Sequence, residues 1–208
     1  MTKKLHIDTL CVQAGYNPTK GEPRQVPIIQ STTFKYDTSE QMGKLFDLEE
    51  NGYFYTRLQN PTNDTTAAQI AAMEGGVAAM LTSSGQAANF FACFNICQAG
   101  DHMITTTSIY GGTYNLFGVT FPKMGIEITF IDQDASDEEW AAAFRPNTKL
   151  VFGETLSNPN VRILDIERIA GIAHQHGVPL IVDNTFPTPV NCRPFEFGAD
   201  IVTHSTTK

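Results

Sequence analysis

Most of this chain repeats one pattern, a short run of apolar residues followed by a longer stretch with helical spacing. The apolar runs cover the ranges 77–84, 102–108, 125–132, 148–156, 178–185 and 199–205. The stretches with helical spacing cover 62–76, 85–100, 111–125, 136–144 and 165–177. Strands that are apolar throughout are typical of a parallel sheet, because crossover helices cover both of its faces. The sequence therefore predicts an α/β domain with a mainly parallel sheet flanked by helices.

Residues 1–60 differ from the rest of the chain. They are rich in Gly, Pro, Thr and Gln, as in GYNPTKGEPRQVPIIQSTTF, and they show little sustained periodicity. A segment of this kind is either flexible or ordered by contact with another chain. We therefore expect two parts, an extended N-terminal arm at 1–60 and the α/β domain at 61–208.

Composition argues against several classes of function. The 208 residues carry a formal net charge of −8, so an electrostatic nucleic-acid footprint is not expected. No apolar run approaches the roughly 20 residues that a membrane span needs, and the N-terminus lacks the apolar region of a signal peptide. The four cysteines have no CxxC spacing, which favours reduced thiols over disulfides or a metal site. We expect a cytoplasmic protein that binds neither nucleic acid nor membrane.

In parallel sheets of this kind, ligands bind outside the carboxyl ends of the strands. The segment SSGQAA joins one predicted strand to a helix, so the backbone N–H groups of Gly85 and Gln86 are placed to hold an anion such as phosphate. The alternative is an ordinary helix cap with a glycine in a tight turn. The chain contains neither GxGxxG nor a Walker loop, so the usual dinucleotide and nucleotide fingerprints are absent.

An aromatic and an acidic residue follow two further strand ends. Tyr110 in TSIYGGTY either stacks on a flat ligand ring or packs against the following helix. Asp183 closes the apolar run VPLIVD, where a lone buried charge is costly and needs a partner. That partner is either a protonated ring nitrogen on a ligand or the local backbone of a turn, helped by Asn184 and Thr185.

Two other segments have local alternatives. Asn158 follows the strand LVFGETL, where its side chain could bond a ring hydroxyl or a substrate carboxylate, or form a turn before Pro159. Tyr55 and Arg57 lie near the end of the arm. The forked guanidinium could complete a phosphate site in a neighbouring subunit, or it could remain a surface side chain beside a packed tyrosine.

The final segment HSTTK places Lys208 close to Ser205 and Thr207 at a strand end. A lysine in this position is either a surface lysine or a desolvated amine that forms a Schiff base. The combination is more informative than any single member. An anion-binding helix start, an aromatic stacker, a strand-end aspartate and a strand-end lysine are the parts needed to hold pyridoxal phosphate (PLP).

The segments YTRLQNPT, SSGQAA, SIYGGTY, ETLSNP, VDNTF and HSTTK together resemble the Cys/Met-metabolism family of PLP-dependent enzymes. The resemblance covers nearly all of the chain and is specific in the order and spacing of its motifs. It implies the PLP-dependent transferase-like fold, with a large domain of the aspartate aminotransferase type, and a homotetramer built from dimers with shared active sites. A non-catalytic protein of the same architecture is disfavoured, because it would not need Lys208, Asp183 and Tyr110 together.

The resemblance gives each candidate residue a role. Lys208 would carry PLP as a Schiff base and shuttle the substrate proton, and Asp183 would pair with the pyridine nitrogen. Tyr110 would stack on the ring and assist as a general acid or base. The remaining cofactor contacts would come from Gly85, Gln86, Ser205, Thr207, Thr185 and Asn158, and from Tyr55 and Arg57 of a neighbouring subunit.

Within the family, IYGGTYNLF and Gln86 resemble the O-acetylhomoserine sulfhydrylase branch, whereas methionine γ-lyases typically have a cysteine in place of Gly112. The resemblance implies γ-replacement, in which sulfide or methanethiol displaces acetate from O-acetyl-L-homoserine and gives homocysteine or methionine. A methionine γ-lyase or a cystathionine γ-synthase or lyase is the alternative, because these motifs mostly bind the cofactor. Family members continue past the lysine into a smaller C-terminal domain that supplies a carboxylate-binding arginine, so we expect that part to be missing here.

Overall fold

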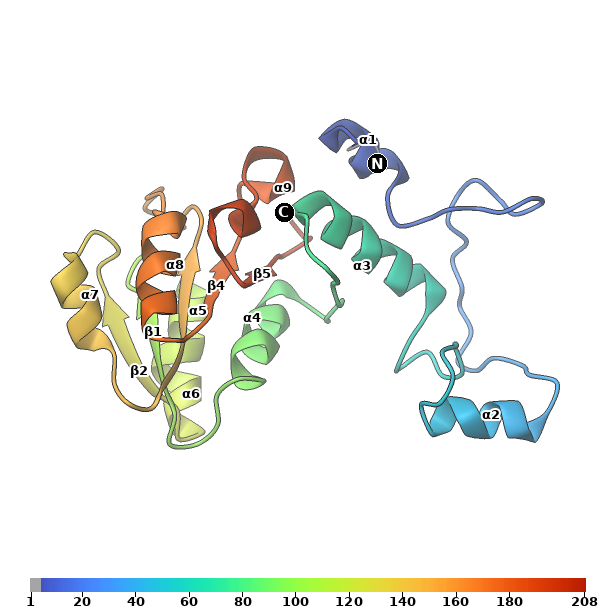
Figure 1. Cartoon of the computed structure of the whole chain (residues 1–208), viewed down its shortest axis with the longest axis horizontal. Helices are drawn as coiled ribbons and strands as arrows, with labels where there is room; N and C mark the ends of the chain where they lie inside the picture. The colour runs from blue at the N-terminus through green and yellow to red at the C-terminus, as the bar shows by residue number, and fades with distance from the viewer. Residues whose placement is uncertain (1–4) are drawn as a thin grey trace. The chain divides into compact units, whose positions relative to one another are not determined.

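The structure is a computed structural model that describes residues 5–208. Its internal contacts divide the chain into two compact units, with the boundary between Leu81 and Thr82. Figure 1 shows the elements of both units along the chain. The second unit, Thr82–Lys208, contains the whole sheet.

Helices and strands alternate through the second unit, while the first unit consists of helices and irregular segments. The helices are α1 (Ile7–Gln13), α2 (Ser39–Phe46), α3 (Pro61–Glu74), α4 (Gly85–Phe94), α5 (Gly111–Asn115), the π-helix η1 (Leu116–Thr120), α6 (Phe121–Lys123), α7 (Asp137–Ala143), α8 (Ile166–Gln175), α9 (Thr188–Asn191) and the 3₁₀-helix η2 (Pro194–Phe197). The strands are β1 (His102–Thr106), β2 (Glu127–Ile131), β3 (Thr148–Glu154), β4 (Leu180–Asp183) and β5 (Ile201–Thr203).

The five strands form one parallel sheet in the order β2-β1-β3-β4-β5. This confirms the predicted α/β architecture with a mainly parallel sheet. The chain leaves β1 in one direction to reach β2 and then crosses to β3 on the other side. In sheets of this order, the crevice outside the carboxyl ends of β1 and β3 is the expected ligand position.

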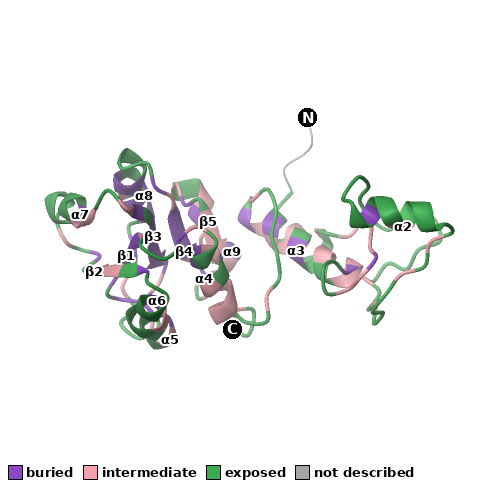
Figure 2. Cartoon of the chain, turned by 90° about the horizontal axis from the view of Figure 1, so that it is seen from below, coloured by how far each residue is buried: buried purple, intermediate pink, exposed green. Residues whose placement is uncertain are grey.

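Both faces of the sheet are buried, as the apolar strands predict. In β3, Leu150 and Phe152 belong to one core and Val151 to the other. The core containing Val151 is covered by α7, which contributes Trp140, and by α8. The opposite core is covered by α4 and by η1 with α6, and it contains Phe117. Figure 2 shows the buried residues concentrated in the strands, so polar groups are left to the ends of the sheet.

Local capping accounts for the helix ends. The helix α3 begins after Asn60, whose side chain accepts a hydrogen bond from the backbone of Thr62, and it ends at Gly75 in the left-handed conformation. The helix α7 opens with a capping box between Ser136 and Glu139. The predicted helix at 111–125 is present, but it changes from α to π geometry in its middle third and back to α over α6.

One predicted strand is absent. Residues 77–84 form no strand, and the side chains of Val77 and Met80 are largely exposed. A strand needs a neighbour to receive its backbone hydrogen bonds, and no strand within residues 5–208 pairs with this run. The prediction was wrong here because apolar composition does not reveal whether a pairing partner exists.

The first unit is organised around α3. The Nε2 of Gln69 donates a hydrogen bond to the carbonyl of Cys11 at 2.6 Å, which ties α3 to α1. An isolated antiparallel bridge joins Thr33 to Tyr55. Contact between residues 1–60 and a neighbouring subunit stays a prediction. Across the part of the chain that the structure describes, no helix is long and apolar enough to cross a membrane.

Candidate active site

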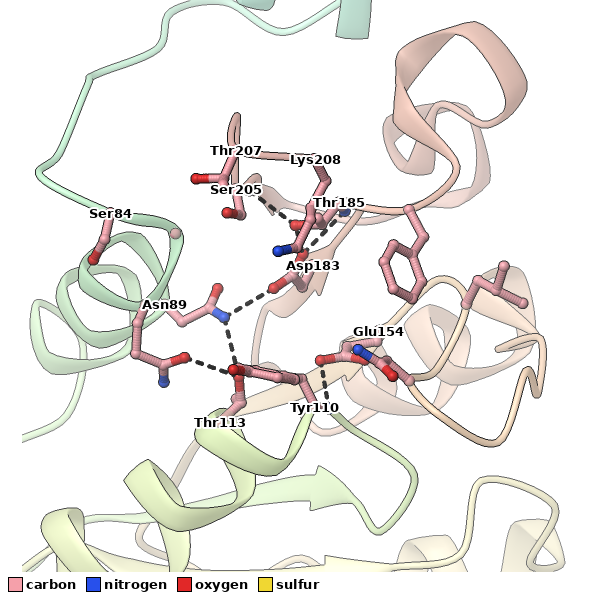
Figure 3. A pocket seen from close by; sticks show the side chains of 15 residues that line it. Ser84, Asn89, Tyr110, Thr113, Glu154, Asp183, Thr185, Ser205, Thr207 and Lys208 are labelled. Carbon is pink, nitrogen blue, oxygen red and sulfur yellow. Dashed lines mark hydrogen bonds between the residues drawn. The ribbon is translucent and has the colours of Figure 1, made fainter.

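A cavity of about 240 Å³ opens at the carboxyl ends of the strands, within the second unit. In Figure 3 its side chains converge from the first turns of α4 and α5, from the ends of β3 and β4 and from the segment after β5. The predicted residues that line it are Gly85, Gln86, Tyr110, Asn158, Asp183, Thr185, Ser205, Thr207 and Lys208. The lining is completed by Ser84, Asn89, Thr113, Glu154, Leu156 and Phe186, none of which was among the predicted site residues.

The start of α4 borders this cavity. The hydroxyl of Ser84 accepts a hydrogen bond from the Ala87 N–H at 3.0 Å. The N–H groups of Gly85 and Gln86, in the first turn of α4, have no acceptor within the helix. A Cβ on Gly85 would lie 2.8 Å from the Ser205 Cα, so only glycine lets the helix start approach Ser205 this closely. The turn therefore presents N–H groups beside a hydroxyl, which suits an anion.

Both carboxylate oxygens of Asp183 accept hydrogen bonds. Oδ1 receives them from the backbone N–H of Thr185 at 3.0 Å and from the Thr185 hydroxyl. Oδ2 receives one from the Nδ2 of Asn89 at 2.9 Å. These donors are neutral, so a cationic group in the cavity would complement the half-buried carboxylate. The local turn contact that the sequence allowed is thus present, and the carboxylate still lines the cavity.

Asn89 is the centre of this network. It is 2% exposed, and its Oδ1 accepts a hydrogen bond from the Thr203 hydroxyl. Its Nδ2 also donates to the Thr113 hydroxyl at 3.4 Å, and that hydroxyl donates to the Oε1 of Gln86 at 3.4 Å. One sequence signal could have identified it, because Asn89 lies four residues after Gly85 and therefore on the same face of α4.

Tyr110 is fixed through its backbone. Its N–H donates to the Oε1 of Glu154 at 2.7 Å, while the side chain is 51% exposed. The ring lies over Gly112, where a Cβ would be 2.5 Å from the ring atom Cε1. In Figure 3 the ring lies across the cavity from Lys208, so its aromatic face can cover a flat ligand ring.

Glu154 brings a second carboxyl group to the cavity. It is the last residue of β3 and is 6% exposed. The pKa of Glu154 is raised to about 7, mainly by burial and also by the negative charge of Asp183, while the backbone N–H groups of Tyr110 and Asn158 oppose the rise. The sequence did carry a signal, because KLVFGE ends in a carboxylate just as VPLIVD does.

The segment that carries Lys208 is tied to Asp183. The Lys208 N–H donates to the carbonyl of Ser205 at 3.3 Å. The Ser205 N–H donates to the hydroxyl of Thr185 at 2.8 Å, and that hydroxyl in turn donates to Asp183. Figure 3 shows the amine of Lys208 pointing into the cavity on the side of Asp183.

Tyr55 and Arg57 belong to the first unit and are not among the residues that line this cavity. The two side chains contact each other, with the guanidinium carbon of Arg57 at 5.2 Å from the centre of the Tyr55 ring. This cation–π contact holds a forked donor beside a hydroxyl group. Their expected role at a neighbouring subunit's phosphate stays a prediction.

The cavity fits PLP, the cofactor expected from the sequence. The N–H groups at the start of α4, with the Ser205 hydroxyl, suit a phosphate, and Asp183 suits a protonated ring nitrogen. The amine of Lys208 is available for a Schiff base. The Nε2 of Gln86 is buried and has no hydrogen-bond acceptor among the described residues, so a donor is left over for a bound molecule.

Comparison with known proteins gives a match along nearly all of the chain. The sequence profile of the family described as Cys/Met metabolism PLP-dependent enzyme matches residues 8–208. An O-acetyl-L-homoserine sulfhydrylase of Corynebacterium glutamicum is 45% identical over 203 residues, which are 97% of this chain and 46% of that protein. A homocysteine/cysteine synthase of Kluyveromyces lactis is 44% identical over 206 residues, which are 98% of this chain and 46% of that protein.

The fold is similar as well. A crystal structure from Campylobacter jejuni, assigned as an O-acetylhomoserine (thiol)-lyase, superposes with a TM-score of 0.94 at 37% identity. The match covers 98% of this chain and 50% of that one, and that structure contains N′-pyridoxyl-lysine-5′-monophosphate. The chain spans about half the length of the curated relatives it matches.

Proposed function

Because this chain belongs to the Cys/Met-metabolism family of PLP-dependent enzymes, we propose that its cavity binds PLP and that the whole protein is an O-acetylhomoserine sulfhydrylase. The observation that carries the proposal is the convergence of Lys208, Asp183 and Tyr110 on one cavity beside the start of α4. PLP, when bound, supplies an electron sink that makes the Cα–H of an amino acid acidic. The residues of the chain supply binding, orientation and proton transfer.

The phosphate end and the ring nitrogen have separate binding groups. The N–H groups of Gly85 and Gln86 hold the phosphate together with the hydroxyls of Ser205 and Thr207. The carboxylate of Asp183 keeps a proton on the ring nitrogen, because an adjacent negative charge favours the cationic form. Its hydrogen bonds from neutral donors fix its direction without neutralising it.

The side chains around the reacting carbon position and move protons. The amine of Lys208 would hold the cofactor, and it is placed to take the proton from the substrate Cα. Tyr110 covers one ring face, and its hydroxyl is a second group for proton transfer. Asn158 and Thr185 provide hydrogen bonds to the cofactor or the substrate carboxylate.

The proposed reaction is γ-replacement. The Cγ–O bond of O-acetyl-L-homoserine breaks with release of acetate, and a Cγ–S bond forms with sulfide or methanethiol, giving homocysteine or methionine. Gly112 favours this branch over methionine γ-lyase. A Cβ at that position would lie 2.5 Å from the Tyr110 ring, so the cysteine typical of γ-lyases requires a different ring position.

The proposal includes a cytoplasmic homotetramer built from dimers, in which Tyr55 and Arg57 bind the phosphate of a neighbouring subunit's cavity. Support comes from the contact between these two side chains, which presents a guanidinium fork and a hydroxyl together. A guanidinium fork matches the geometry of phosphate oxygens.

The activity is tested by incubating the purified protein with O-acetyl-L-homoserine and sulfide, and separately with methionine alone. Homocysteine and acetate in equal amounts are expected from the first reaction. Rapid 2-ketobutyrate from methionine without added thiol would assign the protein to the γ-lyases instead. A colourless protein that cannot be reconstituted with PLP, and that borohydride does not label at Lys208, would refute the cofactor site.

The shared site is tested with two inactive variants, Lys208→Ala and Arg57→Ala. Mixed dimers hold one cavity that has both an intact lysine and an intact neighbouring arginine. Subunit exchange between the variants should therefore restore part of the activity. If mass measurement shows mixed oligomers and no activity returns, Arg57 does not act across a subunit boundary.

A further inference from the structure

Glu154 is a buried carboxyl group to which the proposed chemistry gives no role. It ends β3, the strand at the switch in sheet order, and it lies between the β1 and β4 ends. A buried carboxyl group costs stability unless hydrogen bonds compensate it. The Glu154 carboxyl group therefore needs hydrogen-bond donors, and the identity of these donors indicates its role.

Glu154 faces backbone N–H groups of two turns. The N–H of Tyr110, in the turn after β1, donates to its Oε1 at 2.7 Å. The N–H of Asn158, in the turn after β3, interacts with the same carboxyl group and favours its charged form. These turns are 48 residues apart in the chain (158 − 110) and carry two of the predicted cofactor contacts. A single side chain at the edge of the cavity therefore contacts both turns.

The Asn158 turn has a second, independent anchor that shows it is built to stay in place. The guanidinium of Arg162 donates to the hydroxyl of Ser108 at 3.1 Å and pairs with Asp132 at 2.6 Å. Arg162 thus links the two turns through the buried Ser108 and the exposed Asp132. Glu154 acts on the inner side, where the turns meet the cavity.

We infer that Glu154 is a positioning residue, whose carboxyl group joins the Tyr110 turn to the Asn158 turn and sets how both side chains face the cavity. The inference rests on the proposed cofactor roles of Tyr110 and Asn158. As a positioning residue, Glu154 acts through these two turns and not by contact with substrate or cofactor. A group with an acceptor oxygen at this place keeps the arrangement. A group of the same shape without one releases both turns.

The test compares Glu154→Gln, which keeps an acceptor oxygen, with Glu154→Met, which has a similar shape and no comparable acceptor. Amide hydrogen exchange, followed on peptides covering 107–116 and 155–162, reports how firmly each of the two turns is held. Exchange in both peptides should rise about tenfold or more in the methionine variant and stay near wild type in the glutamine variant. Pyridoxal phosphate affinity should fall roughly tenfold with methionine and less than about threefold with glutamine.

The matched control is Thr148→Val, at the opposite end of the same strand, where the lost hydroxyl contacts His102. It should leave exchange in both peptides unchanged even if it lowers overall stability. If the methionine variant does not fold, Glu154→Asp withdraws the carboxylate by one methylene and carries the same expectation. Wild-type exchange in both peptides of a folded Glu154→Met or Glu154→Asp protein would overturn the inference. A wild-type protein that takes up no pyridoxal phosphate would refute the proposed function, while the exchange data would still decide the role of Glu154.

Discussion

The two ends of the parallel sheet both bury polar side chains, but they do so in different ways. At the amino end, His102 is fully buried and its two ring nitrogens lie 2.8 Å from the hydroxyls of Thr148 and Thr129. At the carboxyl end, Glu154 and Asp183 border an open cavity. In the described part of the chain, the polar atoms of His102 bond only to other buried or partly buried protein groups. The carboxyl groups of Glu154 and Asp183 also face a cavity that a ligand can enter.

This difference indicates that the amino end of the sheet serves stability and the carboxyl end serves ligand binding. A closed polar cluster holds strands together and has no capacity left for a ligand. The open cluster retains such capacity, as the unpaired Nε2 of Gln86 and the N–H groups at the start of α4 illustrate. Substitutions at the carboxyl end should therefore weaken ligand binding, whereas substitutions at the amino end should lower stability without affecting ligand binding.

The largest effect is expected for Lys208→Ala. Activity should fall by more than about 10³-fold, because the proposed attachment point of PLP and the proposed base are lost together. The free energy of unfolding should change by less than about 0.5 kcal/mol, because the side chain is exposed. Turnover assays and urea unfolding check this, with Lys123→Ala on α6 as the exposed-lysine control. Substantial activity in Lys208→Ala would contradict the assignment of function to the carboxyl end of the sheet.

Asn89→Ala should have the next largest effect. It takes a partner away from Asp183 and from Thr203, which is expected to cost about 1–3 kcal/mol of stability and to weaken PLP binding roughly tenfold. Asn147→Ala is the counterpart at the amino end, where the amide donates to the carbonyl of Gly100 at 2.9 Å. That variant should lose some stability and no PLP affinity. Equal loss of affinity in both variants would contradict the distinction between the two ends.

The carboxyl end should lose stability as pH rises. The pKa of Glu154 is raised from 4.5 to about 7, so the folded state holds the proton more tightly than the unfolded state. The contribution is complete below about pH 4.5 and is lost as pH rises through about 7, with a slope of at most about 1.4 kcal/mol per pH unit. Urea unfolding of cofactor-free protein measures this slope, and Glu154→Gln should remove it.

The amino end should respond to pH in the opposite direction. Burial lowers the pKa of His102, Arg145 lowers it further, and Glu127 opposes them. The unfolded state then binds the proton more tightly, so this contribution is present above about pH 6.5 and is lost as pH falls. His102→Gln should flatten the acid side of the same unfolding series by a smaller amount than Glu154→Gln flattens the neutral side. Superimposable pH profiles for wild type and both variants would show that neither group titrates as described.

Sequence reasoning predicted the position of residues whose neighbours along the chain mark a strand end or a helix start. Asp183 and Lys208 each follow an apolar run, and Gly85 stands at the start of a helix, so strand-end placement was enough to bring them to one cavity. The same reasoning overlooked Glu154, although the same signal was present. Asp183 at the end of β4 was predicted as a site residue, and Glu154 at the end of β3 was not.

Other features depend on contacts that no local pattern contains. The spacing from Gly85 could place Asn89 on the right helix face, but not its contacts, because its partners Asp183 and Thr203 lie 94 and 114 residues away. The strand expected at 77–84 failed for a related reason, since pairing depends on a second segment and not on apolar composition. Whether Tyr55 and Arg57 reach a cavity likewise depends on another subunit, which local sequence does not describe.

The same long separations have a kinetic consequence. The bonds from Asn89 to Asp183 and Thr203 close loops of 94 and 114 residues, while the turns of α4 and α8 need only local contacts. Contacts between distant residues form slowly, because the entropy of closing a long loop is lost before the contact is gained. During refolding, helical signal should therefore return before the ability to bind PLP. Uptake of the cofactor then reports that the last strand has joined the sheet.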